Sequence, residues 1–114
     1  MHLTPDILEA AYEFVRATPP FKGWHLPPGD QVEFFISRSR THAADVQDIG
    51  GRWRIRVNDR WCGNYASLVK YMMHEMTHMS QGIGCPTEQA LHGRDFLARA
   101  KAVCRIHHID PKIF

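Results

Sequence analysis

Residues 65–81 read YASLVKYMMHEMTHMSQ and carry an H-E-x-x-H motif formed by His74, Glu75 and His78. Gly82-Ile83-Gly84 follows, and glycines commonly end helices, so the stretch predicts one long helix. Residues four apart on a helix lie one above the other on the same face. The imidazoles of His74 and His78 can therefore converge on one metal ion. Glu75 lies beside them, where a base acting on an activated water must be placed.

The other positions of this helix predict that it is mostly buried. At about 100° per residue, one broad arc is apolar and holds Leu68, Val69, Met72, Met73, Met76 and Met79. A second arc holds Tyr71, His74, Glu75, His78 and Gly82. Only a narrow polar strip remains, made of Lys70, Thr77 and Gln81. This pattern is typical of a core helix that carries a metal site.

Two protein ligands do not complete a catalytic zinc site, which usually has three and an open position. His92 is the preferred third ligand, because imidazole suits zinc and because Gly93 permits close packing of the helix that follows. Glu88 and Asp95 are alternatives: either can replace His92 or accept a hydrogen bond from a ligand. Phe96 is expected to anchor this second helix in the core.

The segments around the motif predict an α+β domain. Thr4 and Pro5 begin an N-terminal helix that ends at Pro19-Pro20. Strands are expected at 32–37, more weakly at 43–47, and at 52–57, where apolar residues alternate with arginines. Residues 48–51 supply a turn, and a last helix is expected over 93–107, with His107 and His108 as caps at its end. The order predicts a small antiparallel meander packed against helices.

Length and composition favour one small cytoplasmic domain over residues 1–114. The net charge of +2 and the 44% hydrophobic content are ordinary for a globular protein. No apolar run reaches the roughly 18 residues that span a bilayer, so no membrane association is expected. Three cysteines without a C-x-x-C pair argue against disulfides, and we expect isolated buried thiols at Cys62, Cys85 and Cys104. The one unusual count is eight histidines, of which His2, His25 and His42 have no expected role.

Basic residues are concentrated in and around the expected sheet. They are Arg38, Arg40, Arg52, Arg54, Arg56 and Arg60. A basic sheet face can follow the phosphates of a nucleic acid, whereas alternating arginines are also typical of a solvated sheet face. Asp45, Asp48 and Asp59 neutralise part of this charge. Nucleic acid is therefore one candidate partner, beside a peptide or protein substrate.

The motif helix, its short spacer and His92-Gly93-x-x-Phe96 resemble the SprT-like family of zinc metallopeptidases, which includes the Spartan proteases. The resemblance covers residues 66–106. It implies His74, His78 and His92 as zinc ligands and Glu75 as general base. It also implies a minimal zincin-like fold in which an edge strand holds an extended substrate. The zinc ribbon and recruitment tail of the fuller Spartan-type architecture are not expected, because the sequence ends at Phe114.

The function expected from these residues is zinc-dependent hydrolysis of peptide bonds, with DNA-associated proteins as one substrate class. Zinc on imidazoles lowers the pKa of a water toward about 7 and polarises the peptide carbonyl. Glu75 would take the proton and pass it to the leaving amine. Tyr71 and Tyr65 are candidate oxyanion donors but are equally typical packing residues. The alternative is a catalytically idle zinc-binding domain that contacts DNA or protein.

Overall fold

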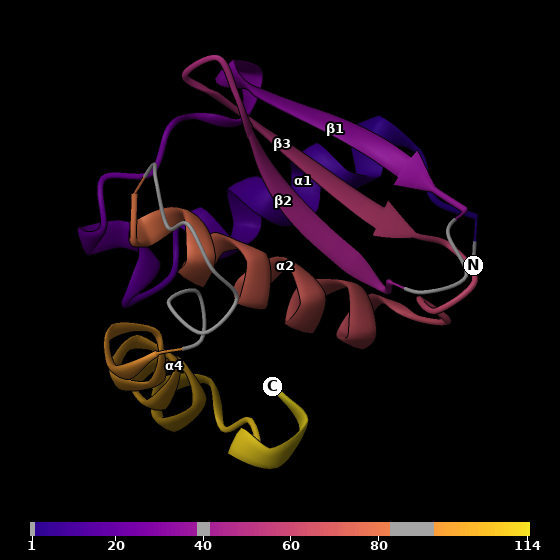
Figure 1. Cartoon of the computed structure of the whole chain (residues 1–114). Helices are drawn as coiled ribbons and strands as arrows, with labels where there is room; N and C mark the ends of the chain where they lie inside the picture. The colour runs from indigo at the N-terminus through magenta and orange to yellow at the C-terminus, as the bar shows by residue number, and fades with distance from the viewer. Residues whose placement is uncertain (1, 39–41, 83–92) are drawn as a thin grey trace.

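A computed structural model describes residues 2–38, 42–82 and 93–114, and these form an α+β fold with a three-stranded sheet (Figure 1). The main elements in chain order are α1 (Pro5–Arg16), β1 (Val32–Ser37), β2 (Ala44–Ile49), β3 (Arg52–Asn58), α2 (Tyr65–Ser80) and α4 (Arg94–His107). Short 3₁₀ turns lie at Phe21–Gly23, Gly29–Gln31 and Pro111–Ile113. The predicted α+β class and the order of the described elements are confirmed.

The sheet is mixed, so the prediction of an antiparallel meander is wrong in one respect. The strand order is β1-β3-β2, with β3 parallel to β1 and antiparallel to β2. The tight turn from β2 to β3 uses Gly50 and Gly51, whose φ angles are 60° and 89°. β3 is the central strand, and its Ile55 and Val57 are fully buried, whereas Ile49 at the end of β2 is exposed.

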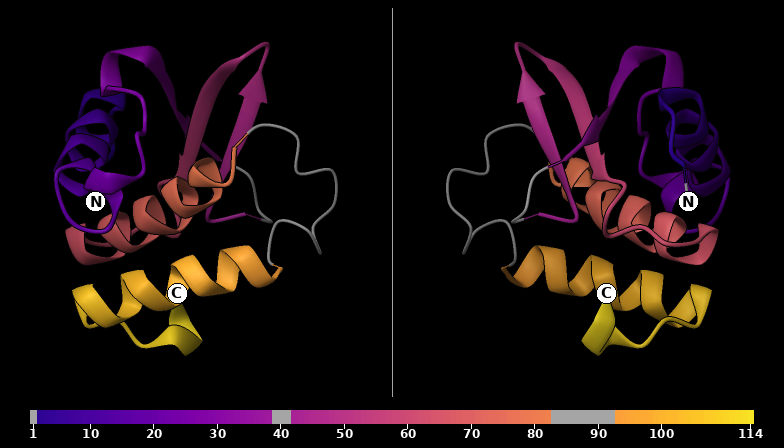
Figure 2. Two further views of the ribbon diagram at one scale, coloured as in Figure 1. Left: turned by 90° about the vertical axis from the view of Figure 1, so that its left-hand side faces the viewer. Right: turned by 90° about the vertical axis from the view of Figure 1, so that its right-hand side faces the viewer.

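The helix α2 lies between the sheet and α4 in the views of both Figure 1 and Figure 2. α1 packs beside α2 and against β1, while α2 itself packs against β2 and β3. The core between these elements is made chiefly of Leu8, Tyr12, Val15, Phe21, Ile55, Val57, Leu68, Met72, Met76 and Val103. The site helix is therefore enclosed on two sides, as its apolar arc predicts.

Two side-chain caps fix where the first two helices begin. The Oγ1 atom of Thr4 accepts a hydrogen bond of 3.2 Å from the Ile7 N–H, which confirms the predicted start of α1. The Oδ1 atom of Asn64 accepts one of 2.9 Å from the Ser67 N–H at the start of α2. Gly93 precedes α4, one residue into the predicted range.

Thr77 departs from the predicted helical wheel. The pattern places it in the narrow polar strip, but its side chain is fully buried. Its Oγ1 donates a hydrogen bond of 2.7 Å to the Met73 carbonyl one turn earlier, so the buried hydroxyl has a partner.

Within the described residues, no helix is both long enough and apolar enough to cross a membrane.

Candidate metal centre

His74 and His78 lie one turn apart on α2 and face each other. Their Nε2 atoms are 3.2 Å apart, and their ring centroids are 4.9 Å apart. A tetrahedral zinc ion with Zn–N bonds of about 2.05 Å would hold two imidazole nitrogens about 3.3 Å apart. The observed separation therefore fits one zinc ion shared by the two rings.

The opposite nitrogen of each ring meets an oxygen. Nδ1 of His74 lies 3.0 Å from the main-chain oxygen of Phe114, and Nδ1 of His78 lies 3.3 Å from Oε1 of Gln81. A hydrogen on each Nδ1 would be donated to these oxygens, and both Nε2 lone pairs would then be directed toward the space between the rings. Two lone pairs at 3.2 Å repel unless a cation lies between them. In this tautomer the pair offers a metal ion two nitrogen ligands.

Phe96, in the first turn of α4, packs on both imidazoles. Its ring stacks on His78 at a centroid distance of 4.4 Å and an interplanar angle of 23°, and it lies 5.2 Å from the ring of His74. Only 4% of Phe96 is exposed, which confirms that it anchors α4 in the core. The ring also shields this side of the histidine pair from water, and so strengthens electrostatic interactions there.

Glu75 is the one buried carboxylate of α2, with 6% of its surface exposed. Burial raises the pKa of this carboxyl to about 8, and the nearby charge of Asp45 adds to the increase. A divalent cation beside it would lower the pKa again by favouring the charged form. The carboxyl is therefore placed to exchange a proton near neutral pH.

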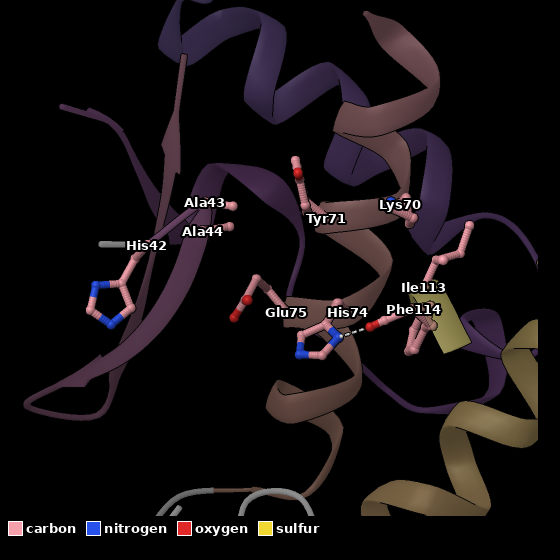
Figure 3. Close-up of a pocket in the computed structure, with 9 residues that line it drawn as sticks. All are labelled: His42, Ala43, Ala44, Lys70, Tyr71, His74, Glu75, Ile113 and Phe114. Carbon is pink, nitrogen blue, oxygen red and sulfur yellow. Dashed lines mark hydrogen bonds between the residues drawn. The ribbon is translucent and has the colours of Figure 1, made fainter. Parts of the chain in front are cut away.

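A cavity of about 270 Å³ separates α2 from the start of β2 and is lined by both His74 and Glu75. Figure 3 shows the Glu75 side chain directed from α2 toward the side where His42, Ala43 and Ala44 lie. The remaining wall is formed by Lys70, Tyr71, Ile113 and Phe114. A ligand in this cavity would therefore meet His74 and the Glu75 carboxyl together.

The predicted third ligand and one of its alternatives lie outside the described residues: these are His92 and Glu88. Asp95 is described and lies on the exposed side of α4, where its Oδ1 is 3.2 Å from Nε of Arg99. Over residues 2–38, 42–82 and 93–114, no group of three or more His, Cys, Asp or Glu side chains is arranged to hold a metal ion. The described part of the site is therefore the histidine pair with Glu75.

Of the two candidate oxyanion donors, Tyr71 lines the same cavity as His74 and Glu75. The hydroxyl of Tyr71 donates a hydrogen bond of 3.3 Å to the Trp61 carbonyl. Tyr65 is 69% exposed at the start of α2. His107, expected as a helix cap, instead places Nε2 2.7 Å from the Pro19 carbonyl, while His108 occupies the predicted capping position.

Three contributors to the site were not predicted from the sequence. Gln81 meets His78 from three residues along the chain, a spacing that could have indicated it. His42 lines the cavity from the start of β2, and its carbonyl accepts a hydrogen bond of 3.2 Å from the Asn58 side chain. The Phe114 oxygen belongs to the main chain and lies forty residues from His74, so no sequence signal could have found it.

The basic residues of the sheet are partly paired with acidic neighbours. Arg54 lies 3.1 Å from Glu33 on β1, and Arg56 forms a two-pronged ion pair with Asp45 on β2. Arg54 also lies 4.6 Å from the centre of the Phe35 ring. Of the other basic residues considered, Arg40 lies outside the described part, and Arg38, Arg52 and Arg60 are exposed.

No protein-family model matches the chain, and neither the curated proteins nor the solved structures gave a significant match.

Proposed function

We propose that the chain is a zinc-dependent endopeptidase of the SprT-like type with a minimal zincin-like fold. The observation that carries the proposal is the pairing of His74 and His78, whose Nε2 atoms lie 3.2 Å apart, together with the buried carboxyl of Glu75, which lines the same cavity as His74. A purely structural metal site has no use for such a carboxyl, and burying one is costly. His92 remains the proposed third ligand.

The chemistry follows from the groups on the cavity wall. Zinc, when bound, supplies Lewis acidity that activates water and polarises a peptide carbonyl. Glu75 takes a proton from the attacking water and passes it to the amine that leaves. Its low exposure keeps bulk water from competing for that proton.

The substrate proposed is an extended peptide segment running along β2. β2 is an edge strand of the described sheet, and Ala43 and Ala44 at its start line the cavity that contains Glu75. Edge strands pair readily with an added strand through main-chain hydrogen bonds. Such a peptide would bring a scissile bond past His74 and Glu75. Proteins associated with DNA remain one class of substrate.

Replacing Glu75 by Gln tests the proposal, with proteolysis of a denatured protein and bound zinc measured on the same sample. We expect zinc to stay bound while the cleavage rate falls by a factor of about 10²–10⁴, the usual contribution of a general base. Glu33→Gln is the control, because this carboxylate is 39% exposed and lies on the sheet, where it pairs with Arg54. Full activity of the Glu75→Gln variant with zinc retained would contradict the assignment.

The alternative proposal is an idle zinc-binding domain that contacts DNA or protein. It would be supported if the unaltered protein bound zinc through four protein ligands and cleaved no substrate. A reducing compartment such as the cytoplasm is proposed for either function, because Cys62 and Cys104 are buried free thiols.

A further inference from the structure

The segment after α4 returns to α2, where Phe114 contacts His74. The main-chain oxygen of Phe114 lies 3.0 Å from Nδ1 of His74, and the two rings are 5.3 Å apart at 47° (Figure 3). We propose that this oxygen is a positioning group of the metal centre: it fixes the hydrogen of His74 on Nδ1 and turns Nε2 toward His78. The inference rests on the proposed zinc site but not on peptidase activity.

The backbone after α4 turns back toward α2 and so brings the Phe114 oxygen to His74. His108 ends the helix with a φ of 57°, which reverses the chain direction. The Oδ1 atom of Asp110 then accepts a hydrogen bond of 3.0 Å from the Lys112 N–H, and the Asp110 carbonyl accepts one of 3.0 Å from the Ile113 N–H. These bonds hold the short turn that delivers Phe114 to His74.

The two histidines differ in the oxygen that their Nδ1 atoms contact. His78 meets Gln81, a side chain of its own helix region, at 3.3 Å. His74 meets a main-chain oxygen that depends on the packing of α4 and the turn beyond it. Such outer partners fix the tautomer of a metal-binding imidazole and raise its basicity, and their loss typically weakens metal affinity 10–100-fold. Zinc affinity is therefore coupled to the docking of residues 111–114.

Side-chain packing supports the same role. Phe114 and Ile113 line the cavity that contains Glu75, and Phe114 also lines a larger groove along α4 together with Phe96. The rings of Phe96 and Phe114 lie 5.2 Å and 5.3 Å from that of His74. Removing Phe114 thus takes away both the acceptor and one aromatic contact of this imidazole.

The test compares two variants of the full chain: deletion of Phe114, which removes the oxygen and the ring, and Phe114→Leu, which keeps the main chain and an apolar anchor. The zinc Kd is measured by competition with a chelator. We expect the deletion to weaken zinc binding 10–100-fold and Phe114→Leu to stay within about threefold of the unaltered chain. Lys112→Ala is the control, because this side chain is exposed in the same turn. An unchanged Kd in the deletion variant would overturn the proposal.

Nitrogen-15 NMR of the zinc-free protein gives a second measurement that needs neither zinc nor a substrate. His74 of the unaltered chain is expected to carry its hydrogen on Nδ1, and the deletion is expected to produce a mixture of tautomers. A His74 of the unaltered chain that carries no hydrogen on Nδ1 would overturn the proposal even if the deletion variant fails to fold. If the protein cleaved no substrate but bound zinc tightly, and the deletion of Phe114 weakened that binding, the proposal would still be upheld.

Discussion

The Nε2 atoms of His74 and His78 lie 3.2 Å apart on α2, with both Nδ1 atoms directed at oxygens. A cation bound between them stabilises the folded chain, because the unfolded chain does not hold the pair together. Free zinc at 100 times its Kd should add about 2.7 kcal/mol to the free energy of unfolding. For a domain of this size, that raises the Tm by roughly 10 °C.

Thermal unfolding in a chelator and in buffered zinc measures this shift. His74→Ala is the matched variant, and its Tm should be the same in both solutions. An equal rise in Tm for the variant would place the zinc elsewhere on the chain.

The raised pKa of Glu75 predicts a pH-dependent stability in the zinc-free protein. The folded carboxyl has a pKa of about 8 against a reference of 4.5, so the folded state holds the proton more tightly. Stability is therefore fully present below about pH 4.5 and is lost as the pH rises toward 8. Between pH 5 and pH 7.5 the loss should be on the order of 3 kcal/mol.

Urea denaturation in a chelator, repeated at several pH values, isolates this contribution when the unaltered chain is compared with Glu75→Gln. The variant cannot ionise at this position, so its stability should fall less over the same range. Parallel curves for the two proteins would show that the Glu75 carboxyl is not protonated in the folded state.

Asn58 ties the end of β3 to the start of β2, which forms the far wall of the cavity. Its side chain is fully buried, its Nδ2 donates a hydrogen bond of 3.2 Å to the His42 carbonyl, and its Oδ1 accepts one of 3.0 Å from the Arg60 N–H. Asn58→Ala leaves these groups without their partner and should cost about 1–3 kcal/mol of unfolding free energy.

Denaturant unfolding measures that cost, with the exposed Gln31→Ala as a control that should stay within about 0.5 kcal/mol. If Asn58→Ala were as stable as this control, the bond to His42 would not hold the cavity wall in place.

The ion pair between Arg56 and Asp45 predicts how the sheet responds to nucleic acid. While paired, Arg56 has its charge balanced, so duplex DNA should bind weakly. Asp45→Asn releases that charge. If the sheet face contacts phosphates, the log–log salt slope of DNA binding should become steeper by about 0.9, the value for one added phosphate contact.

Fluorescence anisotropy of labelled duplex DNA across a salt series measures both slopes. No binding by either protein would exclude the sheet face as a nucleic-acid surface.

Features that depend on residues within one or two helical turns were predicted correctly. Thr4 caps α1 as expected, and the spacing of His74 and His78 places their rings together on α2. The alternation in β3 correctly separates the buried Ile55 and Val57 from their arginine neighbours. In each case, the deciding interaction lies within the segment that carries the pattern.

Features that depend on distant segments were not predicted. The parallel pairing of β1 with β3 joins Val32 to Trp53, and the local pattern of either strand is the same in a meander. Burial of Thr77 depends on how the sheet and α4 enclose α2, and the oxygen on His74 comes from the main chain of Phe114. A hydropathy pattern contains no information on the burial of Thr77 or on the contact between Phe114 and His74.

Zinc content tests the central claim most directly. The protein is loaded with zinc, freed of excess metal and measured by elemental analysis beside His74→Ala and His78→Ala. The site predicts about one zinc per chain in the unaltered protein and almost none in either variant. If the unaltered protein held no zinc, or if all three proteins held the same amount, the claim that His74 and His78 hold a metal ion would be contradicted.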